Sequence, residues 1–75
     1  MEMKRYRITL LCNDIETYQS DPEPFSVCTD LYRTIVHAYE SAGYRLMDSK
    51  QRGDEVSVVL NLGNQRRVVS LEENE

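Results

Sequence analysis

The dipeptide Gly63-Asn64 constrains the fold of this chain more than any other feature, because it separates two runs of apolar residues. Glycine can adopt the positive φ of a primed two-residue turn, so the pair predicts a β-hairpin whose first strand covers 56–62. The turn also fixes the register of the hairpin. One face then carries the pairs Val56/Leu71, Val58/Val69, Leu60/Arg67 and Leu62/Gln65, and the other carries Ser57/Ser70, Val59/Val68 and Asn61/Arg66.

A helix precedes this hairpin. Apolar residues recur there at steps of three and four, and a glycine follows the last of them, which is the pattern of an amphipathic helix with a C-terminal stop. These residues are Leu31, Ile35, Ala38 and Ala42, followed by Gly43. The pattern predicts a helix over 27–42 that begins between positions 22 and 26, where prolines and acidic residues favour a helix N-terminus.

Two further strands complete the predicted sheet. Alternating residues from Lys4 to Cys12 predict a strand with one buried face, and 44–50 predicts another that ends in a turn at 51–54. The order strand, helix, three strands is typical of the α+β class, with one helix on one face of a four-stranded, mostly antiparallel sheet. A right-handed crossover would make the first strand parallel to the second.

The remaining segments lack periodicity. Residues 13–25 contain Asp21-Pro22-Glu23-Pro24 and are predicted to form a long acidic loop, and 72–75 a frayed acidic tail. With 75 residues and 8.8 kDa, the chain is predicted to be a single small domain over 1–75.

Composition and motifs argue against several functional classes. Thirteen acidic residues against nine basic ones give a net charge of −4, which disfavours binding to a phosphate backbone. The apolar runs are too short for a signal peptide or a membrane span, so a cytoplasmic protein is expected. Cys12 and Cys28 are expected to be buried free thiols, and His37 a solvated surface residue. No spacing predicts a metal site, a cofactor site or a catalytic dyad, so we expect a protein that is not an enzyme.

Charge is segregated along the chain. Between Ile8 and Tyr32 there is no Lys or Arg, and five acidic residues give this stretch a charge of −5. One interpretation is a solvated loop; the other is an acidic ridge that steers the protein to a basic partner. The predicted partner-binding residues are Asp14, Glu16, Asp21, Glu23 and Asp30, with Tyr18 as an anchor.

The leading hypothesis is therefore a non-catalytic protein-binding module. It would be a small acidic inhibitor or regulator that occupies a basic surface of a larger protein, for example a surface that binds nucleic acid. Small acidic α/β proteins occur among virus-encoded inhibitors and bacterial regulators, an analogy of size and charge with no motif behind it.

A second surface supports two alternative hypotheses. One helix covers only one face of a sheet, so the opposite face would be open, with an apolar centre inside a rim of arginines. The centre would be Leu11, Met47, Val59 and Val68, and the rim Arg5, Arg7, Arg45 and Arg66. Such a face fits a homodimer or, less well because it lacks aromatic residues, a nucleic-acid binder. The alternative to an interface is an ordinary antiparallel sheet face that is half exposed to solvent.

The helix also has a wide apolar shoulder. Tyr32, Val36 and Tyr39 extend the apolar arc beyond what burial against one sheet requires. We expect Tyr18 or Phe25 to cover this shoulder and complete the core; the alternative is an exposed binding surface.

Overall fold

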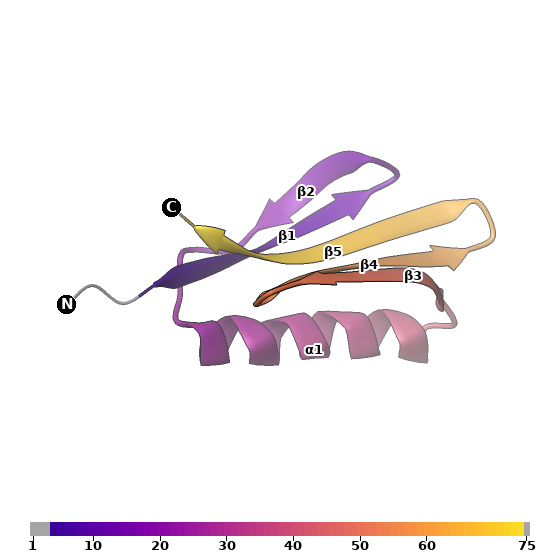
Figure 1. Ribbon diagram of the computed structural model, residues 1–75. Helices are drawn as coiled ribbons and strands as arrows, with labels where there is room; N and C mark the ends of the chain where they lie inside the picture. Colours follow the sequence, from indigo (N-terminus) through magenta and orange to yellow (C-terminus); the bar gives the residue numbers. More distant parts are fainter. Residues whose placement is uncertain (1–3, 75) are drawn as a thin grey trace.

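The computed structural model describes residues 4–74. The elements in chain order are β1 (Arg5–Cys12), β2 (Ile15–Gln19), α1 (Phe25–Ser41), β3 (Arg45–Arg52), β4 (Glu55–Leu62) and β5 (Gln65–Asn74). The strands form one sheet in the order β2-β1-β5-β4-β3, in which all neighbours are antiparallel, and α1 lies along one face (Figure 1). The predicted α+β class with one helix is confirmed, but the sheet has five strands instead of four.

The additional strand is β2, which lies where a long loop was predicted. Asn13 and Asp14 adopt φ of 51° and 69°, the pattern of a type I′ turn, and fold β2 back onto β1. All of β2 is exposed, and its pairing with β1 is interrupted by a bulge between Leu10 and Leu11. The alternation that marks a half-buried strand is therefore absent, and the loop prediction for 13–25 was wrong for 15–19, which form β2.

This hairpin also corrects the predicted crossover. Because β1 is antiparallel to β5, β5 to β4 and β4 to β3, the strands β1 and β3 run in opposite directions. The prediction that the first strand and the strand after the helix are parallel was therefore wrong. The chain enters α1 from β2, and β2 runs in the same direction as β3 at the opposite edge of the sheet.

The β4–β5 hairpin has the predicted register. Val58 lies opposite Val69 and Val59 opposite Val68, and Gly63 adopts a φ of 58° in the turn. β5 continues to Asn74, however, because β1 supplies an antiparallel partner: Glu72 lies opposite Arg7. The prediction of a frayed tail was wrong for 72–74, and position 75 lies outside the described residues.

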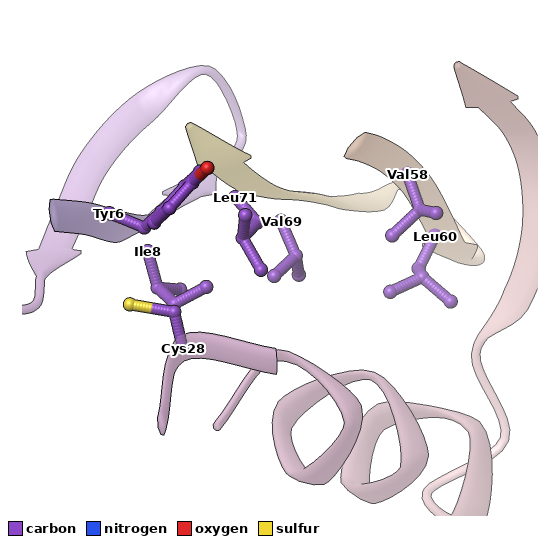
Figure 2. Close-up of a cluster of buried hydrophobic side chains, with 7 residues drawn as sticks. All are labelled: Tyr6, Ile8, Cys28, Val58, Leu60, Val69 and Leu71. Carbon is purple, nitrogen blue, oxygen red and sulfur yellow. The ribbon is translucent and has the colours of Figure 1, made fainter. Parts of the chain in front are cut away.

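The core lies between the sheet and α1. Strand side chains point towards the helix and Cys28 points back from its first turn, whereas the ring of Tyr6 extends along the sheet (Figure 2). The buried set is Tyr6, Ile8, Cys28, Val58, Leu60, Val69 and Leu71. Ile8, Leu60 and Val69 are 0% exposed, so this layer supplies most of the hydrophobic stabilisation.

The apolar shoulder of α1 belongs to the margin of this core. Tyr32, Val36 and Tyr39 are half-buried and pack against the buried cluster. Phe25 packs edge-to-face on Tyr6, with ring centroids 5.0 Å apart, and lines the same hollow as Tyr32. Phe25 thus lies beside Tyr32 of this shoulder, and Tyr18 lines a second hollow together with Tyr39.

Candidate protein-binding groove

A groove opens between α1 and the β1–β2 hairpin. The helix packs chiefly against β1 and β5, while the turn end of the β1–β2 hairpin diverges from the helix (Figure 1). The groove has a volume of about 470 Å³ and almost purely apolar walls. Its lining residues are Leu10, Tyr18, Leu31, Ile35, Ala38 and Tyr39.

The groove is lined by both half-buried and exposed residues. Leu31, Ile35 and Tyr39 are half-buried residues of α1, whereas Ala38 and Tyr18 are exposed, Tyr18 by 44%. The helix presents these side chains because its apolar arc is wider than the strip of sheet beneath it. An apolar surface of this kind on a small protein is typical of a binding site.

Tyr18, predicted from the sequence to be an anchor for a partner, lies in this groove; Leu10, Leu31 and Ala38 were not predicted to be surface residues. The available signal was Asn13-Asp14, two residues that tolerate positive φ, directly after the alternating residues of β1. A hairpin placed there would have put Tyr18 beside Leu10, its partner in the register.

The predicted acidic ridge is divided among several elements. Asp14 occupies the β1–β2 turn, Glu16 lies on β2 and Asp30 is exposed on α1. Asp21 and Glu23 follow β2, and Glu23 exchanges two main-chain hydrogen bonds with Tyr6, of 2.8 and 2.9 Å. The acidic residues therefore do not form one continuous ridge. Asp14 and Glu16 lie at the start of β2, and Asp21 and Glu23 follow its end.

Asp14 is engaged within the chain. Its Oδ1 lies 3.5 Å from the guanidinium of Arg66, and neighbouring Asn13 exchanges two hydrogen bonds of 2.8 Å with the Arg66 main chain. The pair joins one predicted acidic contact to one predicted arginine contact. Neither residue is a free charge on its surface.

The sheet face opposite α1, called here the back face, differs from the prediction at its centre. Leu11, Val68 and Val59 lie side by side across β1, β5 and β4, as predicted, and are half-buried. A bulge at Met47 shifts the register of β3, so Asp48 lies opposite Val59. The predicted four-residue apolar centre was wrong by this one residue.

The arginine rim of the back face is interrupted by other side chains. Arg7 lies opposite Glu72 and Arg5 opposite Asn74, while Arg45 and Arg66 both lie opposite Asn61. With Glu16 on β2 and Asp48 on β3, the face carries both signs of charge. It therefore lacks the uniform positive potential that favours binding to a phosphate backbone.

The titratable groups near the core are held neutral. Burial raises the pKa of the Cys28 thiol, and the charge of Glu23 raises it further. Burial also raises the pKa of Tyr6, as does its 3.0 Å hydrogen bond to Asp54. A thiol with a raised pKa is a weak nucleophile at neutral pH.

Neither a metal site nor a relative identifies the function. Within residues 4–74, no three His, Cys, Asp or Glu side chains gather as they would around a metal ion, and no helix is long and apolar enough to span a bilayer. No protein-family model, no curated protein sequence and no solved structure matches this chain.

Proposed function

We propose that this chain is a non-catalytic protein-binding module that holds a segment of a larger partner in the groove between β2 and α1. The open apolar groove carries this proposal: about 470 Å³ of space is bounded by Leu10 below, Tyr18 on one side and α1 on the other. Burial of Leu, Val or aromatic side chains there would remove apolar surface from water on both partners.

Charge favours a basic partner. Asp21 and Glu23 follow one end of β2, Glu16 lies near the other, and Asp30 lies on the solvent side of α1. The net charge is −4, and no Lys or Arg occurs from Ile8 to Tyr32. Opposite charge on the partner would raise the association rate. Occupying a basic surface in this way is how a small inhibitor or regulator would act.

The test uses random peptides displayed on phage, selected against the immobilised protein. We expect the enriched sequences to combine apolar residues with Lys or Arg. Ala38→Arg places a charged side chain in the groove and should weaken these peptides at least about tenfold, or about 1.4 kcal/mol. His37→Arg is the matched control, because His37 is an exposed neighbour on the same helix and does not line the groove.

Salt provides a second criterion. Association of the selected peptides should slow between about 50 and about 500 mM NaCl, over which the Debye length falls about threefold. Peptides that bind Ala38→Arg and the parent equally would overturn the proposal, provided that circular dichroism shows both proteins folded. Selection of acidic peptides would overturn the charge argument.

The back face supports a second candidate function, a homodimer. Leu11, Val68 and Val59 form an apolar row between Glu16 and Asp48, and arginines lie in adjacent positions. This mixed charge would let two copies pair without crowding like charges. Light scattering should then show a dimer that Val59→Lys dissociates; a parent protein that stays monomeric at millimolar concentration contradicts it.

A further inference from the structure

We propose that the partner segment is extended and joins the sheet as an additional strand on the outer edge of β2. This inference rests on the proposed function, because it concerns how a segment in the groove is held. Among residues 4–74, no strand pairs with the outer edge of β2. β1 occupies its inner edge.

The pairing of β2 with β1 shows which main-chain groups face outward. A two-residue turn closes on a hydrogen-bonded pair, here Cys12 and Ile15, so Glu16 occupies the next, non-hydrogen-bonded position. At the other end the Ser20 N–H donates to the Ile8 carbonyl at 2.9 Å, which makes Gln19 non-hydrogen-bonded as well. The N–H and C=O groups of Glu16 and Gln19 therefore point away from β1 and suit an incoming strand.

The bulged residue between them leaves this edge clear. Thr17 occupies the bulge, and its hydroxyl lies 3.2 Å from Cys12 Sγ and 3.4 Å from the Leu10 carbonyl oxygen. The side chain of Thr17 is thus directed towards β1. Glu16 is the only charged residue of β2, so no lysine or arginine guards its outer edge.

The two faces of β2 define the chemistry of the added strand. Tyr18 lies on the groove face, opposite Leu10, whereas Glu16 lies on the back face, opposite Leu11. Side chains of an added strand alternate between these faces. Alternate residues would therefore be apolar, over the groove, and the intervening ones basic, beside Glu16. The inferred partner is an extended segment of alternating apolar and basic residues.

The main-chain contact is tested by proline substitution. Gln19→Pro removes one outward N–H, and proline is tolerated at such edge positions. It should weaken a fluorescent peptide of about seven alternating valines and lysines at least about tenfold, the value of one lost hydrogen bond. Gln51→Pro is the matched control: Gln51 holds the equivalent outward position on β3, because Arg52 and Glu55 close a two-residue turn.

Methylated peptides test the same contact on the unaltered protein. Methylation of the valine amides and methylation of the lysine amides block opposite edges of the peptide strand. One methylated peptide should lose binding and the other keep it. Peptide binding should also slow amide hydrogen exchange at Glu16 and Gln19 at least about tenfold. The methylated peptides decide the outcome if Gln19→Pro does not fold.

Strand addition is overturned if both methylated peptides bind as well as the parent peptide and exchange at Glu16 and Gln19 is unchanged. If Ala38→Arg still abolishes binding in that case, the groove binds its partner in another conformation and the proposed function stands. If neither the alternating peptide nor any selected peptide depends on Ala38, the proposed function fails as well.

Discussion

The two edge strands of the sheet, β2 and β3, are both exposed throughout but differ in how they present their main chain. On β3 the Ser49 N–H donates a hydrogen bond to Asp48 Oδ1 of the same strand at 2.9 Å, and the strand is bulged at Met47. Four of its eight residues are charged. These are the features by which proteins prevent strand addition, and β2 has only the bulge.

The surfaces beside the two edges differ too. Directly before β3, the ring of Tyr44 is covered by Arg67 of β5, whose guanidinium carbon lies 5.5 Å from the ring centroid. Beside β2, Tyr18 and Ala38 border an open groove. Exposure alone therefore does not distinguish the two edges: of the two, only β2 combines outward main-chain groups, few charges and an adjacent apolar surface.

The largest expected effect concerns the support of the β2 side. Ile8 is fully buried, and its carbonyl accepts a hydrogen bond from the N–H of Ser20, directly after β2. Ile8→Ala should therefore lower the free energy of unfolding by about 2–5 kcal/mol. Leu46→Ala on β3, where the side chain is 47% exposed, should cost about 1 kcal/mol or less. Urea denaturation measures both. Equal losses would mean that the two edges depend on the core alike.

Two serines allow a closer comparison of the edges. Ser20 is buried and its Oγ accepts the Ile8 N–H at 2.8 Å, so Ser20→Ala should cost about 1–3 kcal/mol by leaving that donor unpaired. Ser49 is exposed on β3, and Ser49→Ala should change stability by less than about 0.5 kcal/mol. A Ser20→Ala protein as stable as the parent in thermal denaturation would show that this bond does not anchor β2.

A smaller effect, confined to alkaline solution, concerns the link between the two halves of the sheet. Tyr6 on β1 donates to Asp54 in the β3–β4 turn, and its pKa is raised above 10.0 by burial and by this bond. The neutral phenol is therefore favoured in the folded state. Its stabilisation is complete below about pH 10 and is lost as the pH rises through the raised value. Tyr6→Phe should reduce this alkaline loss in pH-dependent denaturation.

The smallest effect is expected at the tip of the β1–β2 hairpin. Both partners of the Asp14–Arg66 ion pair are at least half exposed, so Asp14→Asn should cost about 0–1 kcal/mol, and less at high salt. Denaturation at low and high NaCl concentrations measures this difference. A larger, salt-independent loss would indicate that the turn conformation, and not the ion pair, depends on Asp14.

The elements that local sequence patterns encode were predicted correctly. Gly63-Asn64 gave the register of the β4–β5 hairpin correctly, because a two-residue turn permits only one alignment of its strands. The three- and four-residue spacing located α1, which begins at Phe25. Of the candidate site, the sequence indicated Tyr18 and the acidic character of its surroundings.

The strand order and the groove depend on contacts between residues far apart in the sequence. The pairing of β1 with β5 joins residues about sixty positions apart, and no local pattern encodes it; that pairing extends β5 to Asn74 and leaves β2 at an edge. The bulge that replaces Met47 by Asp48 opposite Val59 is equally non-local. Whether Leu31 and Ala38 are covered depends on where α1 lies over the sheet, because periodicity defines an apolar arc but not the partner that buries it.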